Sequence, residues 1–339
     1  MKVGILFGGK SNEHEVSIVS ATSIIKNINK EKYDVYPIYL DKNNEFYEVN
    51  DEITDIYKLG EYPKSINKID NVIDYLKKLD KVMPIIHGAY GEDGSIQGFL
   101  ELIGIPYVGC NTLSSAICMD KAITKRLLKS AGINVSKDIL LKEIDNKYYL
   151  DIDGKINKVN VNDINNLIKK ELQYPVFIKP CNSGSSVGIT KVSDNSSLDI
   201  ALKEAFEVDK KVLIEECIQG KELECAILKG KAINVGEIKA SGVFYSYESK
   251  YEDDKSYTII PAKIDEDIKK DIMQISERAF LLVDAKDLAR IDFFLEEKTN
   301  RIILNEINTM PGWTEISMYP KLVMTNDISY EQLIDILLD

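Results

Sequence analysis

The stretch Leu288–Asn308 reads LARIDFFLEEKTNRIILNEIN, and its pattern decides the fold of the C-terminal part of the chain. Two apolar runs flank Lys298–Asn300, a polar segment typical of the turn in a β-hairpin. The simplest pairing across this turn places Glu297 opposite Arg301. That pairing fixes the register of the residue pairs further along the two strands.

The predicted register gathers four polar side chains on one face of the hairpin. Asp292 lies opposite Glu306 and Arg290 lies opposite Asn308, and cross-strand partners share a face. A β-bulge would break this register. Two carboxylates and an amide oxygen on rigid strands suit Mg²⁺, which prefers hard oxygen ligands. The alternative is a solvated face with an Arg–Asp ion pair, but the apolar flanks and the following turn Thr309–Gly312 favour a metal site.

The first third of the chain alternates strand and helix patterns. Val3–Phe7, Tyr33–Leu40 and Lys81–Ile86 have strand patterns, and Glu15–Ile28 has the pattern of a connecting helix. This alternation predicts a small α/β domain with a parallel sheet over residues 1–109.

The rest of the chain predicts two more domains. A helical pattern at Leu113–Ala131 and strand patterns at Tyr174–Lys179 and Lys211–Glu216 indicate a second domain over residues 110–215. The remainder, residues 216–339, has a mixed α+β pattern. The fold class is therefore α/β (α+β) with three domains.

A loop rich in serine and glycine, Lys179–Gly188, follows one of these strands and reads KPCNSGSSVG. Small residues let backbone N–H groups approach an anion closely, and hydroxyl groups add donors. Lys179 would hold a phosphate as a point charge. The alternative is a plain flexible loop, but the coincidence of charge, hydroxyls and glycines favours phosphate binding.

A second glycine-rich segment, Gly4–Ser11, formally matches the P-loop pattern G-x-x-x-x-G-K-S. In a P-loop the strand precedes the first glycine, whereas here Ile5–Phe7 is itself the strand between the glycines. We therefore interpret the match as accidental. A P-loop NTPase stays a rival reading.

Composition excludes several classes of protein. The chain has 339 residues and a net charge of −12, which argues against binding to nucleic acid, since that affinity comes largely from Lys and Arg. Five cysteines without a C-x-x-C pair predict reduced thiols in a cytoplasmic protein. No apolar stretch approaches the length needed to span a membrane, and the N-terminus has the pattern of a buried strand, not of a secretory signal.

Ten short motifs lie in a specific order and spacing along nearly the whole chain. They are Phe7–Gly9, Glu13–Ser17, His87–Gly88, Gly91–Gly94, Gln97–Gly98, Met119–Lys121, Lys179–Gly188, Phe244–Tyr251, Arg290–Asp292 and Asn305–Gly312. In this order they resemble the D-alanine–D-alanine ligase family of the ATP-grasp fold. The resemblance implies an N-terminal parallel α/β (preATP-grasp) domain followed by the ATP-grasp fold.

The resemblance also implies which residues bind ATP. Lys121 and Lys179 would hold its phosphates, together with Ser186 of the glycine-rich loop. Glu215 and Glu222 would hold the adenine amine and the ribose.

The resemblance also assigns roles in the reaction to the polar residues of the hairpin. Asp292, Glu306 and Asn308 would bind two Mg²⁺ ions, with Mn²⁺ as a possible substitute. Arg290 would stabilise the oxyanion of the tetrahedral intermediate.

The first D-alanine would be bound by residues of the N-terminal domain. Glu13 would hold its ammonium group, with His87 nearby, and Ser185 and Tyr251 would complete a hydrogen-bonded group with Glu13. The segment Ser241–Tyr257, which is rich in tyrosine, would form a lid that shields the acyl phosphate from water.

The second D-alanine would contact Gly312, Ser317 and Met318. Lactate-forming relatives usually lack the tyrosine seen here as Tyr251, and resistance-type ligases commonly have arginine where this chain has Met318. The family pattern thus favours D-alanyl-D-alanine, made for peptidoglycan, over D-alanyl-D-serine or D-alanyl-D-lactate.

The resemblance also implies that the protein forms a homodimer. A non-catalytic nucleotide-binding regulator is a rival of another class, but the intact polar set of the hairpin argues against it.

Overall fold

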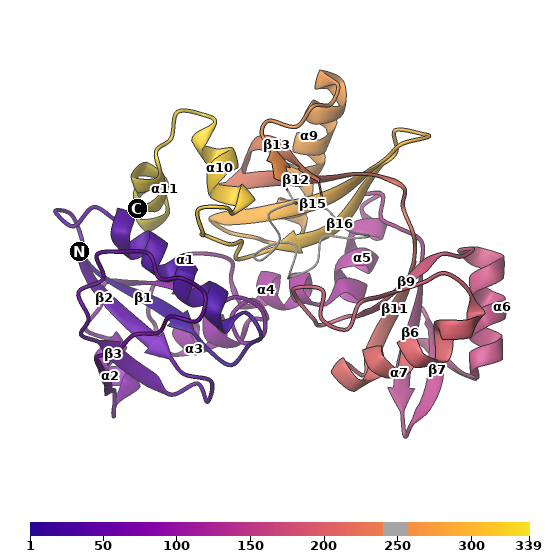
Figure 1. Cartoon of the computed structure of the whole chain (residues 1–339), viewed down its shortest axis with the longest axis horizontal. Coiled ribbons are helices and arrows are strands. Elements are labelled where there is room, and N and C mark those ends of the chain that lie inside the picture. Colours follow the sequence, from indigo (N-terminus) through magenta and orange to yellow (C-terminus); the bar gives the residue numbers. More distant parts are fainter. Residues whose placement is uncertain (240–256) are drawn as a thin grey trace.

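The computed structural model describes residues 1–239 and 257–339 and contains three β-sheets, with helices α4 and α5 between the first sheet and the other two (Figure 1). The predicted lid falls almost entirely on residues 240–256, outside the described residues, and Tyr251 is among them. In the described ranges, no helix combines the length and the apolar composition needed to cross a lipid bilayer.

The first sheet has the strand order β4-β3-β2-β1-β5. Its centre is parallel, as predicted, because β1 pairs with both β2 and β5 in that sense, while β3 and β4 add an antiparallel edge. Its elements are β1 (Lys2–Gly8), α1 (His14–Asn27), β2 (Asp34–Leu40), β3 (Phe46–Val49), β4 (Ile66–Lys68), α2 (Val72–Leu76), β5 (Lys81–Ile85) and α3 (Ser95–Ile103).

Two helices, α4 (Thr112–Met119) and α5 (Lys121–Ser130), replace the single helix that the sequence pattern predicts over residues 113–131. Asp120 ends the first and begins the second, because its backbone is extended and its side chain accepts hydrogen bonds from Ala122 N and Ile123 N, both at 3.1 Å. The break places Lys121 at the N-terminus of α5.

The second sheet is six-stranded, in the order β10-β9-β11-β6-β7-β8. One of its faces packs against α6 and α7 through a cluster of Ile, Val, Leu and Phe side chains. Its elements are β6 (Asp138–Ile144), β7 (Lys147–Ile152), β8 (Lys155–Val159), α6 (Val161–Glu171), β9 (Val176–Pro180), β10 (Thr190–Val192), η1 (Asn195–Ser197), α7 (Leu198–Val208) and β11 (Lys211–Glu216).

The third sheet has the order β14-β13-β12-β15-β16 and is antiparallel. Helix α9 covers one face, where Cys225, Ile291 and Phe293 are buried against Phe280. Its elements are β12 (Gly220–Leu228), β13 (Lys231–Lys239), β14 (Tyr257–Ile259), α9 (Glu266–Leu282), β15 (Leu288–Glu296) and β16 (Ile302–Asn308).

The last two helices, α10 (Met318–Met324) and α11 (Tyr330–Leu338), return to the N-terminal sheet. One apolar cluster contains both Val3 and Ile18 near the N-terminus and Leu333 and Leu337 near the C-terminus. Trp313 is fully buried in the same cluster. The first and third sheets are therefore joined through a common core, which holds the pocket between them in a fixed geometry.

Candidate functional site

The face of the third sheet opposite α9 carries three cross-strand rows of side chains. The first row is Ile238, Glu222 and Phe294; the second is Gly236, Glu224, Asp292 and Glu306; the third is Ala226, Arg290 and Asn308. Because cross-strand partners share a face, the rows place apolar, acidic and basic groups side by side in a fixed order.

The structure confirms the two residue pairs predicted for the hairpin, although the pairing at the turn differs from the predicted one by one residue. Glu296, and not the residue after it, pairs with Arg301, through a 3.0 Å hydrogen bond from its N–H to the carbonyl of Arg301. A β-bulge at Asn305 then shifts the register by one, so that Asp292 lies opposite Glu306. If β16 kept the register that it has near the turn, Asn305 would lie opposite Asp292. The bulge that we expected to break the register instead creates the predicted pairing.

Arg290 is the centre of a buried ion-pair group. Its Nε and Nη2 donate to the two oxygens of Asp292 at 2.8 and 2.7 Å, and its Nε lies 3.1 Å from Oε2 of Glu224. Burial opposes its charge, but the carboxylates of Asp292 and Glu224 outweigh burial and hold the pKa of Arg290 well above its ordinary value. Asn308 Nδ2 donates to the same Asp292 carboxylate at 3.0 Å. The guanidinium is a fixed positive charge.

Two adjoining pockets lie along these rows and share one wall. Ile238, Glu222 and Phe294 line the larger pocket, and Arg290 and Asn308 line the smaller one. The shared wall consists of Lys121, Ser183, Gly184, Ser185, Glu224 and Glu306. Two ligands bound one in each pocket would therefore meet at a place lined by one ammonium group, a Ser/Gly loop and two carboxylates.

The larger pocket combines an apolar end with a buried chain of charges. Phe177 and Phe294 line it, which suits a flat aromatic ring. Lys179 Nζ lies 2.6 Å from Oε2 of Glu215, and Lys125 Nζ binds the other oxygen of the same carboxylate. Burial alone would raise the pKa of Glu215, but Lys125 and Lys179 outweigh it and lower that pKa. Lys125 is shared between Glu215 and Asp138, whose Oδ1 lies 3.4 Å from its Nζ, so Lys179 is the lysine of this chain of charges that lines the pocket.

The predicted phosphate residues Lys121, Lys179 and Ser186 all line the larger pocket, and Lys121 also belongs to the shared wall. Lys121 Nζ donates to the carbonyl oxygen of Ser183 at 2.7 Å and lies 3.7 Å from Oε2 of Glu306. Ser185 and Ser186 have φ values of 48° and 60°, in the left-handed region that non-glycine residues rarely adopt.

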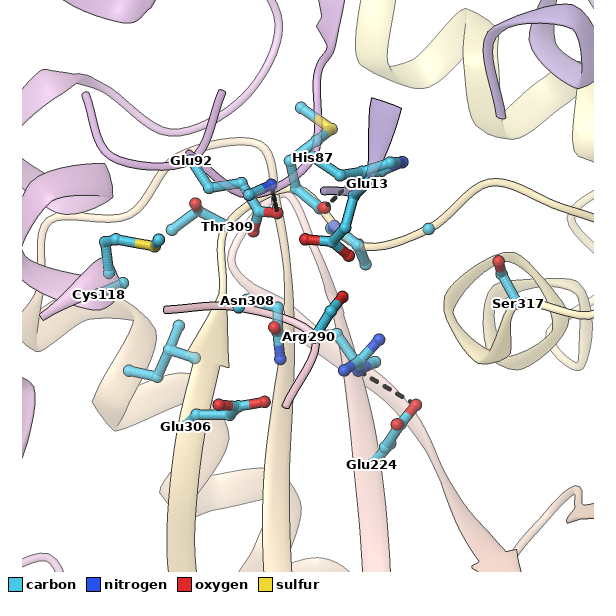
Figure 2. Close-up of a pocket in the computed structure, with 18 of the residues that line it drawn as sticks. Glu13, His87, Glu92, Cys118, Glu224, Arg290, Glu306, Asn308, Thr309 and Ser317 are labelled. Atoms are coloured by element: carbon cyan, nitrogen blue, oxygen red, sulfur yellow. Dashed lines mark hydrogen bonds and ion pairs between the residues drawn. The ribbon is translucent and has the colours of Figure 1, made fainter. Parts of the chain in front are cut away.

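The smaller pocket contains two carboxylates on either side of Gly88 (Figure 2). Gly88 N–H donates to Oε1 of Glu92 at 2.8 Å, and Oε2 of Glu13 lies 2.7 Å from where a Cβ on Gly88 would be. Both carboxylates point into the pocket, across from Arg290. This acidic end suits an ammonium group, and Arg290 at the other side suits an oxyanion.

His87 supports the smaller pocket from behind. It is 3% exposed, its Nδ1 lies 3.1 Å from the carbonyl oxygen of Met310, and its Nε2 lies 3.0 Å from Ser20 Oγ. Because a carbonyl only accepts, Nδ1 carries the proton, and burial lowers the pKa of the ring so that it is neutral. His87 thus fixes the turn after Asn308.

Glu92 gives the site a pH dependence. Burial first, and then the neighbouring Glu13, raise the pKa of Glu92 from 4.5 to about 8. Between these values the folded protein keeps a proton that the unfolded chain has released, so we expect the wild type to lose stability as the pH rises through this window. A Glu92→Gln variant lacks this titration. Thermal melting of both proteins from below pH 4.5 to above pH 8 measures the difference, and parallel profiles would contradict it.

Gly312, Ser317 and Met318, predicted to contact a second substrate, all line the smaller pocket. Ser317 is held by Thr314, whose N–H donates to Ser317 Oγ at 3.0 Å. Met318 is 5% exposed and begins α10. Tyr251, predicted to accompany Ser185 and Glu13, lies outside the described residues.

Comparison with known proteins agrees with this geometry. Residues 2–110 match the family described as "D-ala D-ala ligase N-terminus", and residues 127–339 match "D-ala D-ala ligase C-terminus". The chain belongs to the D-alanine–D-alanine ligase family. A relative with that name from Caldicellulosiruptor bescii is 44% identical over 99% of this chain and 93% of its own length.

Two solved structures of the ligase family extend the comparison. The VanG D-Ala:D-Ser ligase from Enterococcus faecalis is 36% identical, with a TM-score of 0.85 over 99% of this chain and 98% of its own. The D-alanine–D-alanine ligase from Bacillus anthracis complexed with ATP is 29% identical, with a TM-score of 0.76 over 100% of this chain and 96% of its own. The predicted ATP-grasp fold with an N-terminal parallel α/β unit is confirmed.

The predicted metal residues of this family member fit Mg²⁺ by their chemistry. Across the described part of the chain, no group of three or more His, Cys, Asp or Glu side chains is arranged to hold a metal ion. The predicted set has only two such side chains, Asp292 and Glu306, plus the amide of Asn308. Glu306 lies on the shared wall, while Asp292 lines the larger pocket and Asn308 the smaller one. These hard oxygen donors would leave the remaining positions to phosphate oxygens and water, which is how Mg²⁺ is commonly bound with nucleotides.

Three charged residues of the ligase site were missed by the sequence interpretation: Glu224, Lys125 and Glu92. Alternation along β12 from Glu222 was the available signal for Glu224, because residues two apart share a face. Lys125 has no such signal, since it lies one turn after Lys121 on a short, mostly polar helix.

From the sequence alone we interpret His14 as a residue on the surface of its helix, and the structure shows that this interpretation is wrong. It is 2% exposed, with its ring nitrogens 2.6 Å from the carbonyl oxygen of Gly9 and 3.1 Å from the hydroxyl of Tyr39.

The accidental nature of the P-loop match is confirmed, because Ile5–Phe7 is buried within β1 and leaves no loop around a phosphate.

Proposed function

We propose that this protein uses ATP to join two molecules of D-alanine into D-alanyl-D-alanine. The observation that carries the proposal is the pair of pockets with a common wall. ATP in the larger pocket would direct its γ-phosphate toward the wall, and the first D-alanine in the smaller pocket would direct its carboxylate toward the same place. Family membership and an ATP-bound relative support this arrangement.

The reaction would proceed in two steps. A carboxylate oxygen of the first D-alanine attacks the γ-phosphorus, which gives an acyl phosphate and ADP. The amine of the second D-alanine, after losing a proton, attacks the acyl carbon, and inorganic phosphate leaves as the amide forms. Phosphoryl transfer needs positioning and charge neutralisation more than a covalent partner from the protein, which suits a wall of lysines and carboxylates.

Each step has protein groups suited to it. Lys121 and Lys179 would neutralise the phosphates, with Ser186 and its neighbours adding loop donors. Glu215, which was predicted to hold the adenine amine, would instead hold Lys179 in place, because its two oxygens are bound by Lys125 and Lys179. Mg²⁺ held by the side-chain oxygens of Asp292, Glu306 and Asn308 would supply further positive charge at the γ-phosphate.

The amino-acid substrates would bind at the two ends of the smaller pocket. Glu13, with Ser185 lining the same pocket, would bind the ammonium group of the first D-alanine. Arg290, fixed by Asp292 and Glu224, would stabilise the oxyanion of the tetrahedral intermediate. Glu222, on the first row, would bind the ribose.

The identity of the second substrate is a finer proposal. The D-Ala:D-Ser ligase from Enterococcus faecalis has a fold very similar to this chain, so the fold does not separate the two activities. Met318 lines the acceptor end with an apolar, uncharged side chain. We infer D-alanine as the acceptor because its methyl group needs no hydrogen-bond partner.

A product assay tests the function. With ATP, Mg²⁺ and D-alanine alone, we expect phosphate and D-alanyl-D-alanine in equal amounts, and no mixed product when D-serine or D-lactate is added at equal concentration. If D-alanine alone releases no phosphate while D-serine or D-lactate supports turnover, the acceptor is wrong. If none of the three supports dipeptide formation, the non-catalytic nucleotide-binding alternative is favoured.

The cellular setting extends the same proposal. D-alanyl-D-alanine made by this protein would serve peptidoglycan synthesis in the cytoplasm, and the protein would act as a homodimer, as the family resemblance implies. Mn²⁺ would substitute for Mg²⁺ because it accepts the same oxygen ligands.

A further inference from the structure

Gly236 lies at the end of the second row, and the side chain of Met318 occupies the space that a side chain at position 236 would need. A Cβ at this position would lie 2.5 Å from Sδ and 2.9 Å from Cε of Met318. The φ angle of Gly236 is not in the left-handed region, and its strand, β13, is regular where it pairs with Glu224. The backbone conformation at position 236 is therefore one that residues with a side chain adopt, and it is the thioether of Met318 that occupies the place of a Cβ.

Met318 has packed neighbours on one side and the smaller pocket on the other. Its side chain belongs to the apolar cluster that contains Tyr319 and Leu322, and Leu322 Cδ2 lies 3.3 Å from the same point above Gly236. A well-packed interior has few voids, so a displaced side chain moves where space exists. For Met318 that space is the pocket it already lines.

We propose that Gly236 sets the size of the acceptor subsite by leaving room on β13 for the side chain of Met318. The inference rests on the proposed ligation of two D-alanines, in which Met318 lines the subsite of the second. Gly236 itself touches no substrate and acts through Met318 as a positioning residue. A side chain at position 236 would move the thioether toward the acceptor and narrow the subsite.

A Gly236→Ala variant tests this directly. Steady-state kinetics with D-alanine separate a KM for the first and a KM for the second molecule. We expect the second KM to rise about tenfold or more, since one methylene in a substrate pocket changes discrimination by about 10- to 200-fold. The KM for ATP and the first KM for D-alanine stay unchanged. D-2-aminobutyrate, a larger acceptor, is expected to lose more activity than D-alanine.

A double-mutant cycle separates this role from a general packing defect. Met318→Ala removes the clashing atoms, so the double variant Gly236→Ala/Met318→Ala is expected to match Met318→Ala alone in its second KM. Gly98→Ala, whose added Cβ would make only ordinary contacts with Thr112 at 3.5 and 3.7 Å, is the control for a glycine replacement away from the pocket.

Several outcomes would overturn the proposal. It is wrong if Gly236→Ala leaves the second KM unchanged or raises the KM for ATP equally. It is also wrong if the double variant differs from Met318→Ala in its second KM. The methyl NMR signal of Met318, followed in the wild type and in Gly236→Ala without substrates, reports the displacement independently of turnover, and an unshifted signal also contradicts it. Failure of the wild type to make any dipeptide would instead refute the proposed function.

Discussion

Replacing Arg290 by lysine is expected to lower kcat by about 100- to 1,000-fold, the usual cost of losing one donor to an oxyanion. The guanidinium binds both oxygens of Asp292 and also lies 3.1 Å from Glu224. A lysine keeps the charge but cannot make the planar two-point contact, so its ammonium group would be held by one carboxylate and drawn away from the pocket. Single-turnover kinetics, which isolate the chemical steps, measure the effect.

The control for this variant is Arg278→Lys. Arg278 is exposed on α9 and, among the described residues, donates to the carbonyl oxygen of Ala131 at 3.0 Å. Its replacement should leave kcat unchanged. Thermal melting of Arg290→Lys shows whether the buried carboxylates of Asp292 and Glu224 still have a cationic partner. Near-wild-type kcat in a well-folded Arg290→Lys protein would remove Arg290 from the role of oxyanion stabiliser.

Replacing Glu306 by glutamine is expected to reduce kcat by about 100-fold or more, because metal-assisted charge stabilisation supplies several kcal/mol and each 1.4 kcal/mol is about tenfold in rate. Glutamine keeps the shape of the side chain and removes the charge that faces Lys121 on the shared wall. The Mg²⁺ concentration needed for half-maximal activity should rise. Calorimetric affinity for ADP, measured with and without Mg²⁺, gives a second readout that does not depend on turnover.

Glu297→Gln is the matched control for this charge removal. It changes a carboxylate of the same hairpin, at the exposed turn between β15 and β16. Its kinetics and its Mg²⁺ dependence should be those of the wild type. Full activity in Glu306→Gln, with the Mg²⁺ dependence also unchanged, would show that the metal ligands lie elsewhere.

The hairpin illustrates how far sequence reasoning reaches. Alternation correctly predicts that Arg290 and Asp292 share a face with Glu306 and Asn308, because the period of a strand is two. The position of the turn was wrong by one residue, and the bulge at Asn305 compensates. No local pattern marks this bulge, since it depends on how β15 and β16 twist against the rest of the sheet.

Other parts of the site depend on contacts that no pattern records. Asp120 is a favourable N-cap residue, yet the surrounding apolar period continues across it, so one helix is predicted where there are two. The ion pair of Lys125 with Glu215 joins residues ninety positions apart, and the two carboxylates around Gly88 come from separate loops. Resemblance to a family supplies roles for several of these residues, but not the contacts that hold them.

The common core of the first and last segments has a consequence for how the protein is made. Val3 and Ile18 are synthesised well before Leu333 and Leu337, which complete the same apolar cluster. Part of the apolar surface of the N-terminal sheet therefore stays uncovered while the residues between them are being made. The pocket that α10 lines is completed only after this late packing step.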